Sequence, residues 1–274
     1  MAGEQGGRTG AGDPGRTLRL LWPDPAAVPR RGPRQGLTVE AVVSAATRLA
    51  DAEGLEALTM RRVAQALRVA PMTLYTYVPG KGELLDLMLD SAYARMSRTD
   101  TAGRPWRERL SAVAQENRAL YEAHAWAAAV STARPPLGPG GIGKYEHELA
   151  AFDGLGLDDV ETDACLTYLL GFVQSCARAA VQARASVRDS GLDDEQWWAA
   201  NAPLLARVLD ESAYPRAVRI GQAAGAAQGA AYDAGRAYAF GLERVLDGLG
   251  VLIDGRAQRR ARVRPPGRPA GEGS

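Results

Sequence analysis

The chain has 274 residues and a mass of 29.0 kDa, which suits one large domain or two modest ones. Its composition, 46% hydrophobic and 24% charged, is that of folded proteins and excludes the disordered and fibrous classes. The longest apolar stretch without charge, residues 164–177, is 14 residues long, whereas a membrane-spanning helix needs roughly 20. The N-terminus lacks the apolar core of a secretory signal, so neither a membrane protein nor a secreted one is expected.

The net charge of +1 conceals basic ends around an acidic middle. Residues 1–81 carry 11 Arg/Lys against 7 Asp/Glu (net +4), and residues 256–274 carry 6 against 1 (net +5). Residues 82–255 carry 16 against 24 (net −8). This asymmetry indicates a polyanionic partner that binds one end of the molecule.

Residues 1–36 are rich in Gly, Pro and Arg, with one short apolar cluster between Leu18 and Trp22. So few apolar groups do not offset the entropy cost of ordering, and we expect a mostly disordered basic arm. Arg30, Arg31 and Arg34 lie close enough to the next helix to reach a DNA minor groove, although a merely solubilising tail is an equal alternative. Residues 256–274 are expected to form a disordered basic tail.

Apolar residues at helical spacing begin after Thr38, a suitable N-cap, and stop at Gly54. The pattern then predicts three further helices, which are a short one capped by Thr59, one from Pro71 that ends before Pro79, and one over residues 81–96. In the rest of the chain it predicts helices over residues 106–129 (one or two), 144–152, 159–184, 197–208 and 230–253. The Pro/Gly stretch 134–143 and part of 221–231 are expected to be loops. No run alternates like a strand, so the predicted fold is all-α, with a small domain at 37–96 and a larger helical body at 97–255.

The sequence gives little support to enzymatic chemistry. Residues 138–144 match the glycine and lysine spacing of a phosphate loop, but Tyr145 replaces the required Ser/Thr and no strand precedes it, so a helix–helix loop is favoured. The four acids within residues 158–163 suit the start of a helix better than a metal site. The only histidines, His124 and His147, have no metal-binding spacing, and the two cysteines are too few for a zinc site or a disulfide framework. We therefore expect no catalytic residues, no metal and no cofactor, and the cysteines fit a reducing cytoplasm.

Residues 59–81 carry the strongest functional signal. Two short helices separated by a tight turn predict a helix-turn-helix, whose second helix enters the DNA major groove. The second helix presents small, apolar and aromatic residues instead of a salt-bridged face, which suits contacts to phosphates and thymine methyls. Lys81 opposes the dipole of the next helix unless a DNA phosphate docks there, and Arg61 is a candidate reader of guanine.

Residues 38–96 resemble the DNA-binding domain of TetR-family (tetracycline repressor family) transcriptional regulators. The resemblance rests on the first helix and on the sequences Glu53-Gly54-Leu55, Thr59-Met60-Arg61-Arg62-Val63-Ala64, Thr73-Leu74-Tyr75-x-Tyr77-Val78-Pro79-Gly80-Lys81 and Glu83-Leu84-Leu85. It implies base contacts by Arg61, Pro71 and Met72. It implies mainly contacts to the sugar–phosphate backbone of DNA by Met60, Thr73, Tyr75, Tyr77 and Lys81. Two residues depart from the family pattern: Arg68 replaces a turn glycine, which strains the turn if its φ is positive, and Ala70 replaces a capping Ser/Thr.

The body resembles the tetracycline-repressor type of C-terminal domain through Trp106, Arg134-Pro135 and the helix that follows. The resemblance suggests five pocket residues: Asn117, Arg134, Tyr145, Glu148 and Phe172. Ser97, Val113 and Val130 stand where drug-binding repressors hold a polar drug contact, an asparagine and a magnesium-ligating histidine. These departures favour an inducer other than a tetracycline–magnesium complex.

The expected function is a homodimeric, ligand-responsive transcription factor, most simply a repressor that a small-molecule inducer releases from a palindromic operator. The alternatives are an activator, a regulator without a ligand, or a helical enzyme or carrier with a DNA-binding appendage. An apolar stripe on the last helix consists of Leu242, Val245, Leu246, Leu249 and Leu252. We expect this helix and the helix at 159–184, from each of two chains, to form the dimer interface. An inducer pocket lined by the aromatic residues of the body is expected to act through the helix at 81–96, as the only connection between the two domains.

Overall fold

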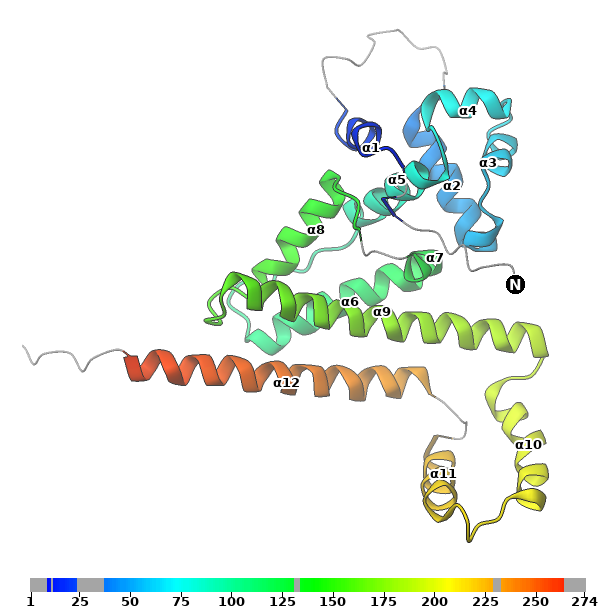
Figure 1. The fold of residues 1–274 in the computed structure, drawn as a ribbon, viewed down its shortest axis with the longest axis vertical. Coiled ribbons are helices and arrows are strands. Elements are labelled where there is room, and N and C mark those ends of the chain that lie inside the picture. The colour runs from blue at the N-terminus through cyan, green and yellow to red at the C-terminus, as the bar shows by residue number, and fades with distance from the viewer. Residues whose placement is uncertain (1–8, 11, 24–36, 131–133, 229–232, 264–274) are drawn as a thin grey trace, which may run out of the picture.

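The computed structural model describes residues 9–10, 12–23, 37–130, 134–228 and 233–263, and these contain helices and no strand (Figure 1). The helices are α1 (Pro14–Leu21), α2 (Val39–Glu53), the 3-10 turn η1 (Leu55–Ala57), α3 (Met60–Ala66), α4 (Pro71–Tyr77), α5 (Lys81–Ala94), α6 (Trp106–Ala123), α7 (Ala125–Ala129), α8 (Pro139–Ala150), α9 (Asp159–Ser190), α10 (Asp194–Val208), α11 (Pro215–Gln228) and α12 (Ala234–Val263). The all-α prediction is confirmed. Arg30, Arg31 and Arg34 lie outside the described residues.

Helices α2, α3 and α4 form a small domain at one end of the molecule, on the first turns of α5 (Figure 1). The Thr38 hydroxyl accepts the Ala41 amide at 3.1 Å, and the Thr59 hydroxyl accepts the Arg62 amide at 3.2 Å, so both predicted N-caps are present. In the turn between α3 and α4, Arg68 has a φ of 57°, a left-handed conformation that strains a residue other than glycine. No side chain caps the start of α4 at Ala70.

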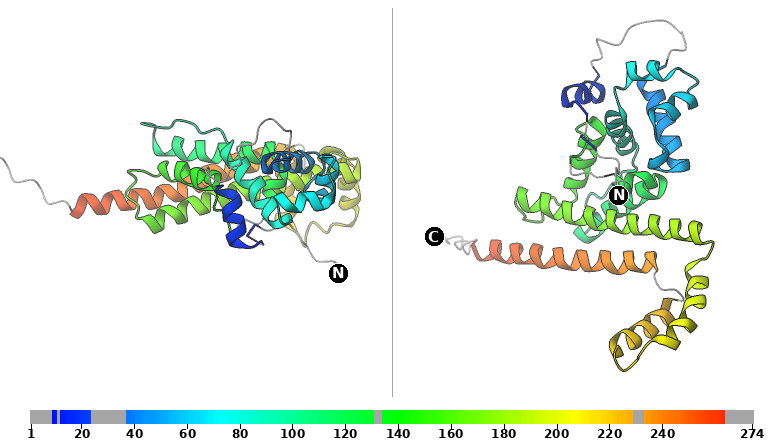
Figure 2. Two further views of the ribbon diagram at one scale, coloured as in Figure 1. Left: turned by 90° about the horizontal axis from the view of Figure 1, so that it is seen from above. Right: turned by 45° about the vertical axis from the view of Figure 1, so that its right-hand side comes forward.

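The larger body is built on α6, α9 and α12. Helices α9 and α12 run side by side, α6 packs against both, and α8 crosses between α5 and α9 (Figures 1 and 2). A capping box starts α9, where Asp158 accepts the Glu161 amide at 2.8 Å, which confirms the capping interpretation of the acidic residues. Helices α10 and α11 project from the body, and no residue of α10 is buried within this chain.

Two contacts besides α5 connect the small domain to the body, so the expectation that the helix at 81–96 is the only connection is wrong. Asp51 on α2 accepts a hydrogen bond from the Trp126 indole at 2.8 Å and pairs with Nδ1 of His124, also at 2.8 Å. The N-terminal segment packs on α5 and also reaches the loop before α8. Movement of the body can therefore reach the small domain by more than one route.

The expectation of disorder over residues 1–36 is wrong for the described part, which contains α1. Pro14 occupies the first helical position, and the Asp13 carboxylate caps the helix by accepting the Arg16 amide at 2.7 Å. Leu21 is 5% exposed. The short apolar cluster is thus ordered by packing against α5, a tertiary effect that composition does not reveal.

Four other predicted boundaries also differ from the structure. Helix α8 starts at Pro139 and so includes half of the expected Pro/Gly loop at 134–143, because Gly140 lies against the backbone of Asp90 on α5, where a side chain does not fit. Helix α9 extends to Ser190, α11 continues through the expected loop to Gln228, and α12 runs to Val263, past the predicted start of the tail at residue 256. The four alanines within residues 223–227 favour the continuation of α11.

The apolar stripe on α12 packs inside the chain. Val245, Leu246 and Leu249 are each 6% exposed, in contact with the core formed by α6 and α9. The other two residues of the stripe, Leu242 and Leu252, are only half-buried. The expectation that a single chain leaves the stripe partly exposed therefore holds for these two residues and is wrong for the other three. Helical periodicity identified a buried face correctly but did not tell an intramolecular partner from an intermolecular one.

Candidate functional site

The predicted DNA-reading residues form an exposed surface on α3 and α4. Arg61 is exposed, and no hydrogen bond or ion pair holds its side chain within the described part of the chain. Its neighbour Arg62 is instead bound to both oxygens of Glu53 on α2, at 2.6 and 2.8 Å. The Arg61 guanidinium is therefore available to a ligand, whereas that of Arg62 holds α3 against α2.

On α4, Leu74 is fully buried and anchors the helix, while the residues around it face outward. Met72 is 76% exposed and Tyr75 43%, and Pro71 and Thr73 are also exposed. Tyr77 is half-buried. An exposed surface of methyl, hydroxyl and aromatic groups without ion pairs is better suited to contacts with phosphates and base edges in a DNA major groove than to exposure to solvent.

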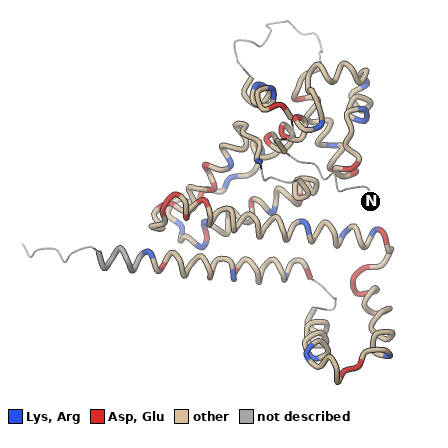
Figure 3. Tube along the Cα trace, viewed as in Figure 1, with Lys and Arg blue, Asp and Glu red and all other residues tan. Residues whose placement is uncertain are grey.

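Met60 departs from its predicted role, because its side chain is only 8% exposed and belongs to the core of the small domain. Lys81 is the first residue of α5, where no side chain caps the helix, and its ammonium forms no hydrogen bond or ion pair within the described residues. Figure 3 shows basic residues on α1, α3 and the start of α5, and acidic residues clustered at the start of α9. This distribution fits a phosphate-binding end.

A cavity of about 560 Å³ lies in the body, enclosed by α5, α6, α8, α9 and the loop that precedes α8. Its walls consist of Tyr93, Asn117, Tyr121, Pro135, Pro136, Leu137, Gly141, Ile142, Lys144, Tyr145, Glu148, Asp163, Leu166, Thr167, Leu170, Gly171 and Gln174. This volume is typical of pockets for drug-sized molecules, and the mixture of apolar walls with few polar groups is typical as well.

A buried polar network lies in one wall of this cavity. The Asn117 amide donates to Oε1 of Glu148 at 2.5 Å and to the Val113 carbonyl at 2.9 Å. Lys144 pairs with Glu148 at 2.7 Å, and its ammonium lies 5.2 Å from the centre of the Tyr93 ring. Glu148 is 1% exposed, so a full charge pair is held in a largely dry wall, where it can orient a polar group of a ligand.

Three tyrosines from different helices also face the cavity. Burial is the main reason that the pKa of Tyr93 is raised well above its ordinary value and that of Tyr121 to about 12, so both phenols stay protonated and remain donors at neutral pH. Tyr145 donates to Asp163 at 2.8 Å, which joins α8 to α9 and raises the pKa of the Tyr145 phenol. The site therefore offers aromatic faces and neutral hydroxyls.

Of the five predicted pocket residues, Asn117, Tyr145 and Glu148 line the cavity. Arg134 does not, since it is exposed beside Gly10. Phe172 does not either, because it stacks on Tyr238 of α12, with ring centres 5.8 Å apart, as part of the packing between α9 and α12.

Among the other aromatic residues expected to line the pocket, Tyr121 does so, while Trp106, Trp126, Trp197 and Trp198 do not. Tyr93 and Lys144 were missed. Lys144 carried a usable signal in the sequence, since it is one of only two lysines and stands four residues before Glu148.

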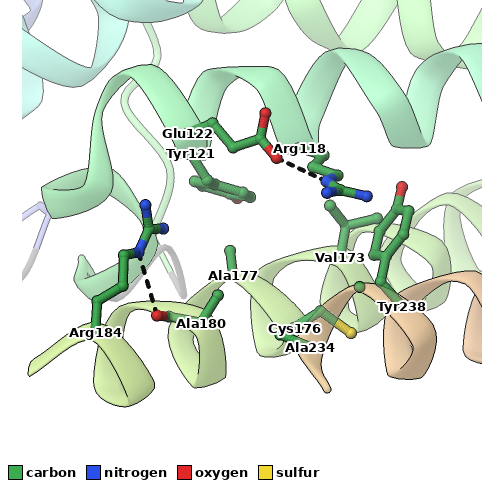
Figure 4. Close-up of a pocket in the computed structure, with 11 residues that line it drawn as sticks. Arg118, Tyr121, Glu122, Val173, Cys176, Ala177, Ala180, Arg184, Ala234 and Tyr238 are labelled. Atoms are coloured by element: carbon green, nitrogen blue, oxygen red, sulfur yellow. Dashed lines mark hydrogen bonds and ion pairs between the residues drawn. The ribbon is translucent and has the colours of Figure 1, made fainter. Parts of the chain in front are cut away.

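A second cavity, of about 80 Å³, lies between α6, α9 and α12 and shares Tyr121 with the larger one (Figure 4). Arg118 bonds to Glu122 at 2.8 Å and stacks over the Tyr238 ring at 4.6 Å. The buried Tyr238 hydroxyl has no partner among the described residues, and burial raises its pKa to about 12. This cavity holds little more than water.

Apolar side chains cover the outer face of α9 and α12. Val160 is 81% exposed and Tyr168 60% on α9, and Phe240 is 65% exposed and Val251 77% on α12. Helix α9 is long and apolar enough to pass a simple test for a membrane span, with a mean hydropathy of 1.3 over 18 residues, of which 22% are buried in this chain. An exposed apolar surface of this kind is typical of an interface with another chain.

Comparison with known proteins agrees with this architecture. Residues 42–88 match the family described as bacterial regulatory proteins, tetR family, and residues 100–253 match the tetracyclin repressor-like C-terminal domain. The chain is 42% identical over 258 residues to the HTH-type transcriptional repressor DrrR1 of Streptomyces coeruleorubidus, with 94% of this chain and 92% of that protein covered.

Solved structures of ActR from Streptomyces coelicolor superpose on the chain. The apo form has a TM-score of 0.64 at 27% identity and covers 81% of this chain and 98% of ActR. The complex with actinorhodin has a TM-score of 0.65 at 28% identity and covers 79% of this chain and 96% of ActR. With both of its domains matched in order, and with a repressor relative aligned over nearly its whole length, the chain belongs to the TetR family of DNA-binding transcriptional regulators.

Proposed function

We propose that the protein is a cytoplasmic, homodimeric repressor that binds a palindromic operator and is released by a small organic ligand, with no enzymatic activity. The carrying observation is the cavity of about 560 Å³, whose walls include α5, the helix that also begins at the DNA-binding surface. A ligand in this cavity contacts Tyr93 near the end of α5, and Lys81 stands at the other end. One rigid helix thus touches both sites.

The chemistry of the cavity supports a planar, partly polar ligand. Tyr93, Tyr121 and Tyr145 supply aromatic faces, and the Asn117–Glu148–Lys144 network supplies fixed polar groups. The related ActR binds actinorhodin in a solved complex, which supports a small organic ligand of that kind here. Val113 is 2% exposed and Val130 fully buried, so neither supplies a metal ligand for a tetracycline complex.

Dimerisation is supported by the apolar outer face of α9 and α12, defined by Val160, Tyr168, Phe240 and Val251. Gly171 and Gly248 on these helices have no atom within 4 Å of an added Cβ, which leaves room for close approach of a second copy. Two copies joined here form a four-helix interface, and a two-fold dimer requires half-sites about 34–36 Å apart on DNA.

The proposed DNA-binding role is tested by replacing Arg61 and Lys81 separately with alanine. Arg61→Ala should cost about 1–3 kcal/mol on the cognate duplex and relax the preference at one base position, because a guanidinium that reads guanine discriminates between bases. Lys81→Ala should weaken binding to all duplexes alike and reduce the salt dependence by about one released counterion, because it contacts a phosphate. Fluorescence anisotropy on selected and scrambled duplexes, at several salt concentrations, separates the two effects.

Arg68→Gln is a suitable control, since that turn residue is exposed and has no predicted base contact. Equal losses on cognate and scrambled duplexes for Arg61→Ala would remove it from the base-reading role. An unchanged salt slope for Lys81→Ala would remove the phosphate contact.

A further inference from the structure

The N-terminal strap, defined as residues 9–10 and 12–22, is tied to α5 by hydrogen bonds from its backbone amides. The Gly10 amide donates to both carboxylate oxygens of Asp86, at 3.0 and 3.3 Å, and the Asp13 amide donates to Glu83 at 3.3 Å. Gly12 lies so close to the Glu83 carboxylate that a larger residue there does not fit without movement. The strap therefore sits in a defined register along the first two turns of α5.

The other end of the strap is fixed to the wall of the ligand cavity. The Trp22 indole donates to the Leu137 carbonyl at 2.7 Å, although the side chain itself is 52% exposed. Leu137 lines the cavity together with Pro135 and Pro136, in the loop that leads into α8. One short segment thus bridges the loop at the cavity and the end of α5 that begins next to the DNA-reading surface.

A row of acidic residues on α5 connects these contacts. Glu83, Asp86 and Asp90 recur at helical spacing, and all three are less than 10% exposed. The first two hold the strap, and Asp90 accepts the Gly141 amide of α8 at 2.7 Å. The same face of α5 therefore holds both the strap and the start of α8, which is another wall of the cavity.

We propose that the N-terminal strap is a coupling element, which transmits displacement of the loop at 134–138 to the start of α5 through Trp22, Glu83 and Asp86. This inference rests on the proposed function and adds a path that runs outside the cavity, parallel to the direct contact of α5 with α8. A ligand that moves Leu137 pulls on Trp22, and the strap passes that movement to the helix that carries Lys81. By linkage, DNA that fixes α5 must in turn change the stability of the loop.

Hydrogen–deuterium exchange on the full-length protein tests this path without any inducer. The probe is a duplex that the wild-type protein selects from a random library, added at saturation. In the wild type, the duplex should change the exchange of amides in residues 134–142. Trp22→Phe keeps an aromatic ring but removes the donor, so in the free protein these amides should exchange roughly fivefold faster. The effect of the duplex on them should fall by about half or more in the same variant.

Leu18→Gln is the matched control, because Leu18 lies on the same helix, is 42% exposed and carries no charge, so both readouts should stay unchanged. Deletion of residues 1–23 should reduce the effect of the duplex on residues 134–142 at least as far as Trp22→Phe does, with the remainder carried by the direct contact of α5 with α8. The proposed coupling is wrong if the duplex leaves the exchange of residues 134–142 unchanged in the wild type. It is also wrong if this exchange in Trp22→Phe matches the wild type, with and without the duplex. Failure of any duplex to bind is a separate result, which counts against the proposed function.

Discussion

Val251→Asp is expected to convert the protein to folded monomers and to weaken operator binding by about 100-fold or more, because the DNA-binding domains of the two copies no longer bind the operator as one unit. Val251 is 77% exposed on α12, on the face shared with Phe240. A carboxylate in the middle of an apolar interface has no partner and must lose its hydration, whereas on a monomer it stays in water. Sedimentation velocity and circular dichroism at micromolar concentration measure association and folding together.

Leu246→Asp provides the contrast, because Leu246 is 6% exposed and packs inside the chain. This substitution should unfold or aggregate the protein instead of yielding folded monomers. Glu243→Gln, at a charged and exposed position of the same helix, should leave association unchanged. A Val251→Asp protein that stays dimeric at micromolar concentration would show that another surface joins the two copies.

Glu148→Ala is expected to lower the free energy of unfolding by about 3–5 kcal/mol, the cost of leaving a buried charge without its partner. The Lys144 side chain is only 12% exposed, and Glu148 is its ion-pair partner at 2.7 Å. The Asn117 amide also loses its acceptor. Urea denaturation at neutral pH, followed by circular dichroism, gives the difference in free energy.

The double variant Lys144→Met with Glu148→Leu separates charge pairing from packing. Replacing a buried ion pair by apolar residues of similar volume is often close to neutral, so the double variant should recover most of the loss. It should also bind a polar aromatic ligand more weakly, because the fixed polar groups are gone. A loss of less than about 1 kcal/mol for Glu148→Ala would show that Lys144 finds water or another partner easily.

The small domain was largely predictable from the sequence because its signals are local. Thr38 and Thr59 cap their helices as expected, Pro71 starts α4, and Arg68 adopts the positive φ inferred from the missing glycine. These features depend on neighbours within four residues. The burial of Met60 was missed because it depends on the packing of α3 against the rest of the domain.

The body was predictable as a set of helices but not as a site. Asn117, Tyr145 and Glu148 were placed correctly in the cavity, yet the order of the N-terminal strap and the early start of α8 were not foreseen. Both depend on carboxylates of α5 that accept backbone amides from segments 51 to 76 residues away in the chain. No local pattern in a sequence carries that information.

The central claim is that operator binding and occupation of the cavity oppose each other within one molecule. The most direct test takes the compound that raises the melting temperature most among planar, partly polar aromatic compounds, with actinorhodin included, and measures both halves of a thermodynamic cycle. Duplex affinity is measured with and without the compound, and compound affinity with and without the duplex. The account predicts that each weakens the other by the same factor, roughly 5- to 150-fold. A compound that binds in the cavity, as shown by loss of binding in Ile142→Trp, but leaves duplex affinity unchanged would contradict it.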